Sequence, residues 1–166
     1  MDDVTLAYAA GFLDGEGTIT ANYRVSPKTA TPALHYRVMV FNTNREILEW
    51  FRDTFGGRTS LYGSPRHEHH KQVYSWWVSS QEAASVLRLL LPYLRIKRRQ
   101  AELVLQMADL RYEYVKGKRG RQVTPAILEA RRGLVEEIVR LNHRGALPVE
   151  LSATNGVAAS FSRLKE

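Results

Sequence analysis

The chain has 166 residues, of which 44% are hydrophobic and 25% are charged, a composition typical of one globular domain with a sizeable core. Its 24 lysines and arginines exceed its 17 aspartates and glutamates, and the net charge of +7 indicates a nucleic acid or an anionic membrane as partner. A membrane is disfavoured because no apolar run approaches the roughly 18 residues that cross a bilayer, and the absence of cysteine excludes disulfides, thiolate metal sites and cysteine nucleophiles.

The first patterned segment, residues 5–14, predicts a short apolar helix that either Asp2 or Asp3 can cap. One face of this helix carries a small residue at every fourth position: Ala7, Gly11 and Gly15. Glycine inside a helix costs about 1 kcal/mol relative to alanine, so two of them need a reason. A smooth face that allows a second helix to pack closely is the best reason.

Directly after this helix the chain reads Asp14-Gly15-Glu16-Gly17, two carboxylates in a glycine-rich turn. Glycine leaves the Glu16 carboxylate unshielded and lets the backbone of a polyanion come close. A pair of such helices ending in exposed carboxylates predicts a metal site at an interface. The alternative is that the apolar residues before the turn are ordinary core.

Two strand–strand–helix units follow in the chain. In the first, residues 18–24 and 35–42 alternate as half-exposed strands around a long loop at 25–34, and residues 45–55 have helical spacing. Gly56-Gly57 ends that helix. The second unit repeats the order as strand 58–63, polar loop 64–70, strand 72–79 and helix 81–91.

Two more helices are predicted at 95–114 and 125–142, joined by a cationic loop at 116–121. The whole pattern predicts an α+β fold, an α-β-β-α-β-β-α core whose antiparallel sheet packs on helices with one face and leaves the other wet. We expect a domain at 1–144, with its core at 5–95 and C-terminal helices at 96–144. Residues 145–166 are expected to form a partly ordered tail.

The wet face of this sheet is rich in side chains that can read DNA bases. Asparagine, glutamine and arginine match the base edges in a major groove, which a β-ribbon can enter. The candidates are Thr20, Asn22, Arg24, His35, Arg37, Met39, Gln72, Tyr74 and Trp76. Each one alone could be a solvated surface residue, but as a set on a basic domain they favour base reading.

Other basic and aromatic residues fit less specific roles. Lys28 in the 25–34 loop would extend the DNA contact outward. The cationic loop could bind phosphates with Lys116, Lys118 and Arg119, or could simply be a solvated loop. Residues 67–70 contain three histidines but predict a polar hairpin tip rather than a zinc site. Trp50 and Trp77 are interpreted as core.

The run Ala9-Ala10-Gly11-Phe12-Leu13-Asp14-Gly15-Glu16-Gly17 resembles the LAGLIDADG motif of homing endonucleases. It differs from the usual motif in having Ala9 where leucine is usual and Glu16 where aspartate is commoner. The chain contains one copy, as in the homodimeric members of that family. From Thr5 to about Asn142 the resemblance extends to the order of elements and to a few spacings.

This resemblance implies a saddle-shaped sheet lying on double-stranded DNA. It also implies a sequence-specific homing endonuclease that makes a staggered double-strand break, with short 3′ overhangs, in a long pseudo-palindromic site. The hydrolysis would depend on Mg²⁺ or Mn²⁺. In a homodimer the stripe at Ala7, Gly11 and Gly15 would meet its copy, and Asp14 would hydrogen-bond to the partner helix.

The resemblance also implies roles for particular residues. Glu16, with Gly15, would hold the metal near the dyad, and two such carboxylates in proximity call for a cation between them. Lys97 matches a basic residue that the family brings into the active site, where it would stabilise the phosphate transition state. Arg95 would assist it or contact a phosphate. Asn42, or Asn44 in another register, would position solvent with support from Arg45.

The rival hypothesis is a non-catalytic protein of the same fold, such as a transcription regulator or a maturase that binds intron RNA. Glu16 and Lys97 favour the nuclease, since a pure binder needs neither. The acidic start, Met1-Asp2-Asp3, does not suit a secretory signal or a transit peptide, so we expect a prokaryotic cytoplasm or an organelle.

Overall fold

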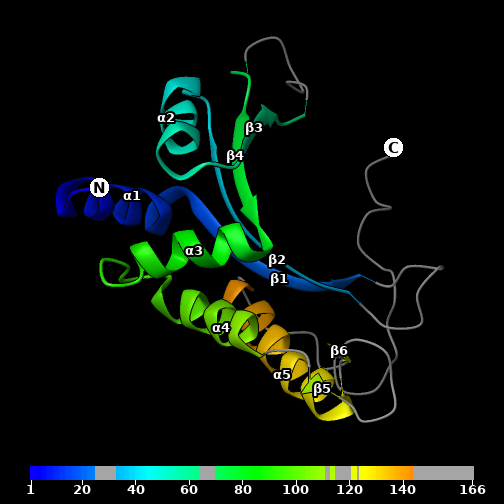
Figure 1. The fold of residues 1–166 in the computed structure, drawn as a ribbon. Helices are drawn as coiled ribbons and strands as arrows, with labels where there is room; N and C mark the ends of the chain where they lie inside the picture. The colour runs from blue at the N-terminus through cyan, green and yellow to red at the C-terminus, as the bar shows by residue number, and fades with distance from the viewer. Residues whose placement is uncertain (25–32, 64–69, 111–112, 115–120, 123, 144–166) are drawn as a thin grey trace, which may run out of the picture.

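The computed structural model describes residues 1–24, 33–63, 70–110, 113–114, 121–122 and 124–143. Over these ranges the elements follow one another as Figure 1 shows. They are α1 (Asp3–Glu16), β1 (Gly17–Arg24), β2 (Ala33–Asn42), α2 (Arg45–Phe55), β3 (Arg58–Leu61), β4 (Tyr74–Ser79), α3 (Ser80–Leu90), α4 (Arg98–Asp109), β5 (Glu113–Tyr114), β6 (Arg121–Gln122) and α5 (Pro125–Asn142). The predicted α+β fold and its α-β-β-α-β-β-α order are confirmed.

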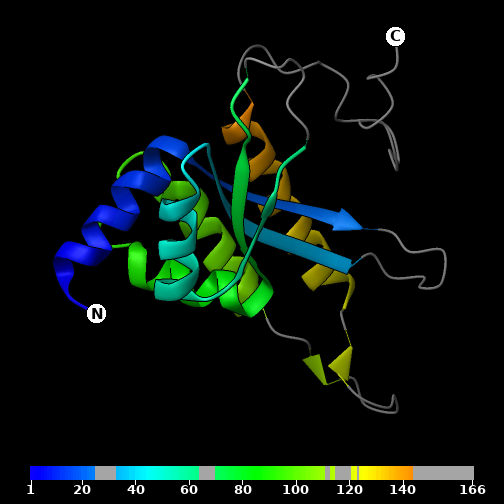
Figure 2. The same ribbon diagram turned by 90° about the horizontal axis from the view of Figure 1, so that it is seen from above.

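The main sheet has four antiparallel strands in the order β1-β2-β4-β3. Gly17 at the start of β1 lies opposite Val40, and Val38 in the middle of β2 lies opposite Val78 of β4. Figure 2 shows α1 at one end of the sheet and the far ends of β1 and β2 at the other. The chain therefore passes from α1 into the sheet at the end where β2 also finishes.

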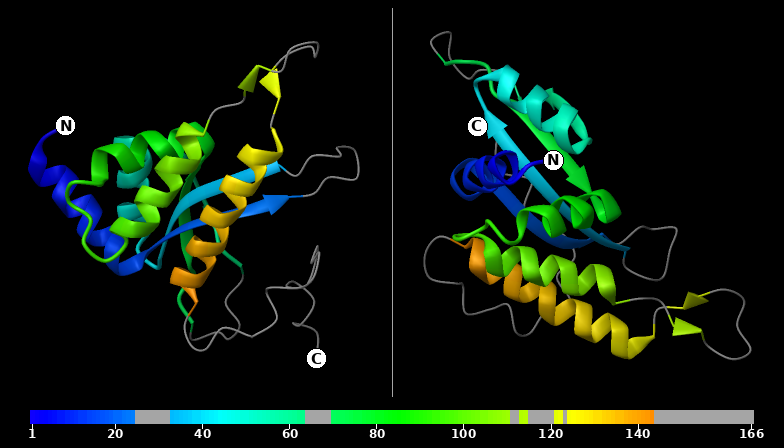
Figure 3. Two further views of the ribbon diagram at one scale, coloured as in Figure 1. Left: turned by 90° about the horizontal axis from the view of Figure 1, so that it is seen from below. Right: turned by 60° about the vertical axis from the view of Figure 1, so that its left-hand side comes forward.

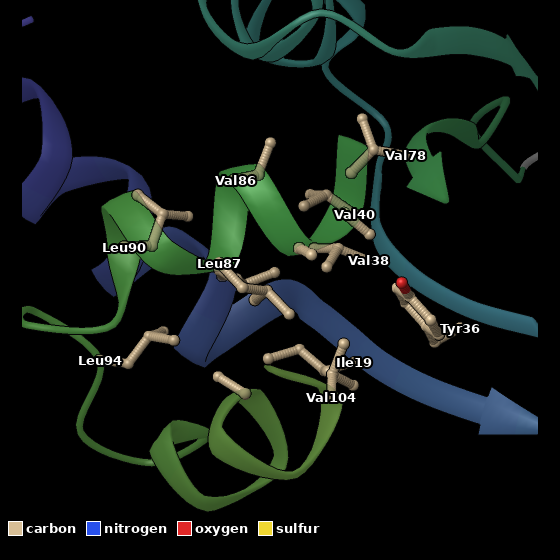
Figure 4. Packing of buried hydrophobic residues seen from close by; sticks show 14 of the residues in the cluster. Ile19, Tyr36, Val38, Val40, Val78, Val86, Leu87, Leu90, Leu94 and Val104 are labelled. Atoms are coloured by element: carbon tan, nitrogen blue, oxygen red, sulfur yellow. The ribbon is translucent and has the colours of Figure 1, made fainter. Parts of the chain in front are cut away.

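One face of the sheet carries the hydrophobic core. Ile19, Val38, Val40 and Val78 point inward and are almost fully buried, together with residues from all five helices. Figure 4 shows the side chains of α3 and α4 converging on these strands. The alternation of period two follows from the pleat, which sends successive side chains to opposite faces.

The helical layer covers the sheet strand by strand. Helix α2 contacts β4, α3 contacts β2 and β4, and α4 and α5 contact β1. Figure 3 shows α4 and α5 side by side. The side-chain amide of Asn142 donates to the carbonyl oxygen of Ile19 at 2.8 Å, so α5 caps part of the β1 edge that would otherwise expose its backbone groups.

The junction of α2 and β3 requires glycine. Gly57 has a φ of +85°, and a Cβ atom there would lie 2.6 Å from the carbonyl oxygen of Trp77. The preceding carbonyl, that of Gly56, accepts a hydrogen bond from the indole N–H of Trp76 at 2.8 Å. This glycine pair, predicted as a helix stop, thus also lets the turn pack directly on β4.

Several predicted boundaries are wrong. The helix expected at 95–114 begins at Arg98 and ends at Asp109, and residues 113–114 pair instead with 121–122 as the two-stranded sheet β5–β6. Strands β3 and β4 are shorter than the predicted 58–63 and 72–79. Among the described residues no helix is long and apolar enough to cross a membrane.

Candidate functional site

The acidic segment predicted as a turn is the last turn of α1. The helix continues through Gly15 and Glu16, and the backbone N–H of Gly17 still donates to the carbonyl oxygen of Leu13. A Cβ atom at Gly17 would lie 2.7 Å from that oxygen, so only glycine allows the helix to lead straight into β1. Glu16 is exposed, and its carboxylate has no hydrogen-bond or ion-pair partner among the described residues.

Asp14, two residues earlier, is buried with 8% of its surface exposed. Its carboxylate accepts three backbone N–H groups from the segment that precedes α4: Arg95 at 2.8 Å, Ile96 at 3.1 Å and Lys97 at 2.9 Å. These N–H groups precede the first turn of α4, where the positive end of the helix dipole favours a carboxylate. Asp14 thus uses three of the roughly four acceptor positions of its carboxylate within its own chain, and a hydrogen bond from Asp14 to a partner helix stays a prediction.

The side chain of Lys97 makes a second contact with Asp14. Its ammonium group donates to the backbone carbonyl oxygen of Asp14, in the last turn of α1. The C-terminal end of a helix leaves its carbonyls unsatisfied and negative, so a cation there is favoured. The structure thereby brings the Lys97 ammonium to the same helix end as Glu16, although 81 positions separate the two residues in the chain.

Helix α1 is anchored at both ends to the segment between α3 and α4. At its start Asp2 is the cap, and the bond from the Thr5 N–H, 2.7 Å long, lowers the pKa of Asp2. The hydroxyl of Tyr93 donates to Asp3 at 2.8 Å, which raises the pKa of Tyr93. With Asp14 at the other end, these contacts fix the rotation of α1 about its own axis.

That rotation decides which face of α1 is open. Leu6, Ala9, Ala10 and Leu13 are buried against the core. Ala7, Gly11 and Gly15 are exposed, and a Cβ atom added at Gly11 or Gly15 would meet nothing within 4 Å. Packing against the described residues of the chain therefore gives no reason for either glycine. Val4 and Tyr8 extend the same exposed surface with 80% and 52% of their surfaces accessible.

Asn42 and Arg45 lie at the end of β2 and the start of α2. Because Val40 lies opposite Gly17, the last two residues of β2 extend past the start of β1 toward the end of α1. The Asn42 side chain accepts the N–H of Asn44 at 2.8 Å, while Asn44 itself caps α2. Arg45 pairs with Glu49 at 2.8 Å. Both asparagine side chains therefore accept a backbone N–H at this junction, and the choice between Asn42 and Asn44 stays open.

The open face of the sheet carries most of the side chains predicted to read DNA. Thr20, Asn22, His35, Arg37 and Met39 are exposed or half-buried and alternate with the core residues of β1 and β2. Arg24 lies at the end of β1, and its side chain is outside the described residues. Lys28, Lys116, Lys118 and Arg119 also lie outside the described residues.

The prediction for β4 is wrong by one residue. Trp76 is fully buried and belongs to the core, whereas Trp77, interpreted as core, is half-buried on the open face. Tyr74 packs against the core on the same side as Trp76. A slip of one residue moves every side chain of a strand to the other face. The prediction started the strand at Gln72, whose side chain instead bonds to the carbonyl oxygens of Gly63 and Val73.

Sequence reasoning missed Arg58 and Trp77, and the register makes their relation clear. Arg58 is the first residue of β3, lies opposite Trp77 in the sheet and is exposed. Two adjacent tryptophans in a strand must point to opposite faces, so one of the pair had to face outward. The sequence contains that signal, but not which tryptophan faces outward.

The open face of the sheet and the C-terminal end of α1 carry different functional groups. The face carries cationic and amide hydrogen-bond donors on three strands, while the end of α1 carries the Glu16 carboxylate, a backbone carbonyl and the Lys97 ammonium. Among the described residues of one chain, no three histidine, aspartate or glutamate side chains come together as a metal cluster. A divalent ion at Glu16 would accordingly draw on a second chain, on bound phosphate or on water for its other ligands.

Comparison with solved structures identifies the fold. The archaeal intron-encoded homing endonuclease I-Vdi141I, solved with DNA, matches with a TM-score of 0.68 and 18% identity over 88% of this chain and 89% of that one. The homing endonuclease I-CvuI, in complex with a DNA target and Mg, matches at 0.67 and 22% over 87% and 86%. The LAGLIDADG homing endonuclease I-GzeII, in complex with its DNA target, matches at 0.53 and 15% over 82% of this chain and 43% of that one.

These likenesses confirm the LAGLIDADG homing-endonuclease fold, as the motif at 9–17 implied. At such identities the similarity is one of fold. The sequence itself matches no protein-family model and no curated protein.

Proposed function

We propose that this chain, which has the LAGLIDADG homing-endonuclease fold, works as a homodimeric, metal-dependent endonuclease that cuts both strands of a long pseudo-palindromic DNA site. The break would be staggered, with short 3′ overhangs. The functional unit would be the domain at 1–144. The observation that carries the proposal is Glu16, which is exposed and has no partner among the described residues, at the end of a helix face whose glycines no contact with those residues explains.

The open sheet face is the proposed DNA surface. It is free of the helical layer, and Asn22 and Arg37 supply side chains that match base edges. The net charge of +7 favours the duplex at long range. Because each phosphate contact releases counterions, affinity should fall steeply as salt rises.

The dimer contact is proposed to be the open face of α1. Two helices approach closely where small residues line both faces, and Ala7, Gly11 and Gly15 offer such a line. An isologous contact of this kind places equivalent residues on either side of the dyad. The two Glu16 carboxylates, one residue beyond the stripe, would then lie near each other.

The donors present fit a hard divalent cation. Glu16 has a free carboxylate and Gly15 a neighbouring backbone carbonyl, and Mg²⁺ or Mn²⁺ accepts one or two carboxylates together with phosphate oxygens and water. A bound ion of this kind activates water and neutralises the charge that builds up on phosphate. In the dimer each chain would contribute one Glu16, so that both DNA strands could be cut.

Lys97 is the proposed electrostatic catalyst. Its ammonium already lies at the end of α1, bonded to the Asp14 carbonyl, and can exchange that oxygen for a phosphate oxygen of the scissile group. A preorganised cation is most effective where charge develops in the transition state. Arg95 is exposed beside it and is proposed to hold a neighbouring phosphate. Asn42, supported by Arg45, is proposed to position solvent from the other side.

The test is cleavage of a randomised DNA library in the presence of Mg²⁺, with sequencing of the cut ends. We expect one preferred site with a staggered double-strand cut. Glu16→Gln should lower the cleavage rate at that site by roughly 100-fold or more, since even residues behind a metal ligand contribute 10–100-fold. Glu82→Gln, which changes an exposed carboxylate at the start of α3, is the matched control and should cut normally.

Two outcomes would count against the enzyme. If Glu16→Gln cuts as fast as the parent, the metal assignment is wrong. If the library yields selected binding but no cut with Mg²⁺ or Mn²⁺, the chain is a DNA-binding protein of this fold, and the same selection with RNA would then test the maturase alternative.

A further inference from the structure

One indole on the open face gathers two guanidinium groups. The Cζ atom of Arg37 lies 5.2 Å from the ring centroid of Trp77 in β4, and the Cζ atom of Arg58 lies 5.3 Å from the same centroid. Arg37 belongs to β2 and Arg58 to β3, which are the two neighbours of β4 in the sheet. Three adjacent strands therefore build one cluster, which we call the Trp77 cluster.

The two arginines of the Trp77 cluster have no carboxylate partner in the described part of the chain. Neither takes part in an ion pair or a hydrogen bond there. Other described arginines do, among them Arg45 and Arg88, whose guanidinium nitrogens lie 2.8 Å from a carboxylate oxygen. The cluster thus differs from the ion pairs on the helices, because among the described residues its two guanidinium groups face an aromatic ring and no carboxylate.

Stacking has a particular consequence for arginine. A guanidinium that stacks on an aromatic ring keeps its N–H edge free to donate hydrogen bonds in a fixed direction. Two like charges around one ring repel each other, and an electron-rich acceptor would relieve that repulsion. A guanidinium held in this way also loses less side-chain freedom when it binds, which favours geometric selectivity over simple charge attraction.

The position of the Trp77 cluster on the sheet indicates what it reads. In register, Met39 of β2 lies opposite Trp77, and Arg58 of β3 lies opposite it on the other side, so the cluster crosses the open face from strand to strand. A sheet that enters a major groove contacts bases with the side chains of its face. The base that arginine recognises with two parallel hydrogen bonds is guanine, through O6 and N7.

We infer that Trp77 is a positioning residue that holds Arg37 and Arg58 against guanine bases in each half of the DNA site. This inference rests on the proposed DNA binding, and it adds Arg58 and Trp77 to the residues that set specificity. It does not depend on cleavage or on the metal.

The test is binding selection from a randomised DNA library with Ca²⁺ in place of Mg²⁺, carried out on the parent and on four variants. Arg37→Ala and Arg58→Ala should each relax one guanine preference, by roughly 5-fold or more, because a bidentate contact discriminates by at least that factor. Trp77→Leu, which keeps apolar bulk without the ring face, should relax both preferences together. Trp77→Phe, which keeps a ring, should restore part of each.

A merely structural role for Trp77 would give a different result. Trp77→Leu would then lower affinity for all sequences alike and leave the guanine preferences as in the parent, which would overturn the inference. The inference would also be overturned if both arginine variants lost affinity equally for all DNA sequences and showed a smaller salt dependence, because this is the behaviour of phosphate contacts. If the parent selects no DNA sequence at all, the proposed function itself fails, whereas unchanged cleavage by Glu16→Gln would leave this inference standing.

Discussion

Replacing Asp14 with asparagine tests whether the carboxylate, rather than a dimer contact, holds the segment before α4. In the parent, one carboxylate oxygen accepts from Arg95 and Ile96, and the other accepts from Lys97, at 2.8 to 3.1 Å. Asparagine keeps one acceptor oxygen but turns an NH₂ group toward a backbone N–H. At least one bond to a charged acceptor, worth about 1.5–3 kcal/mol, is lost and a buried donor is left unpaired.

We therefore expect the free energy of unfolding to fall by about 3 kcal/mol, which corresponds to roughly 6–12 °C in melting temperature for a chain of this size. The measurement is a thermal or urea melt of the protein without DNA, at a concentration series that separates dimer effects. Asp53→Asn is the matched control, because the Asp53 side chain is 65% exposed and, among the described residues, pairs with the adjacent Arg52 alone. This variant should change stability by less than about 0.5 kcal/mol. A melting temperature of Asp14→Asn within about 2 °C of the parent value would refute the claim that the Asp14 carboxylate holds the segment before α4.

The remaining predictions concern the open helix face, the core and the edge of β1. Gly11→Ala should leave the fold intact or stabilise it by up to about 1 kcal/mol, because the added Cβ meets none of the described residues within 4 Å. The same substitution should weaken self-association in sedimentation, and stronger association would contradict a dimer contact at Ala7, Gly11 and Gly15. Trp76→Phe should cost about 2–3 kcal/mol, because it loses volume and a bond to a carbonyl, whereas Trp77→Phe should cost less than about 1 kcal/mol; equal costs in urea melts would contradict the observed faces. Burial raises the pKa of the Tyr23 hydroxyl above 10.0. The stabilising contribution of Tyr23 is therefore complete below pH 10.0 and is lost as pH rises through the folded pKa. The unfolding free energy of Tyr23→Phe should fall less between about pH 9 and pH 11 than that of the parent, and an equal fall would exclude Tyr23 as a source of the pH dependence.

Local signals predicted the helices that have them. The caps and the 3.6-residue spacing placed the helices at 45–55 and 125–142 at the bounds that the structure has. The segment before α4 lacks such a signal. Residues 95–97 continue an apparently helical pattern, but Asp14, far away in sequence, takes their N–H groups and α4 begins only at Arg98. A partner at that distance leaves no trace in the local pattern.

The two faces of β4 illustrate a second limit. Alternation shows that Trp76 and Trp77 point to opposite sides, but the choice depends on contacts from α2. Phe51 packs against the Trp76 ring at 4.9 Å between centroids, and the Gly56 carbonyl accepts its indole N–H. These partners come from another element, so the strand sequence alone leaves both arrangements open. The motif at 9–17, by contrast, located the helix end that carries Glu16.

The cluster on the open face needed three strands to assemble. Arg37 and Arg58 are 21 positions apart in the chain and Arg58 and Trp77 are 19 apart, and only the strand order β1-β2-β4-β3 brings them together. Sequence reasoning could find Arg37 because the alternation of β2 is regular, but it could not relate that arginine to a tryptophan assigned to the other face.

Subunit mixing tests the shared metal site most directly. Parent and Glu16→Gln chains are unfolded, combined in equal amounts and refolded, and the double-strand cleavage rate is measured on the selected DNA site with Mg²⁺. If each break needs Glu16 from both chains, only the parent homodimers are active, and we expect about one quarter of the parent rate at equal total protein. A rate of about one half, the value for chains that act independently, would contradict the dimeric site.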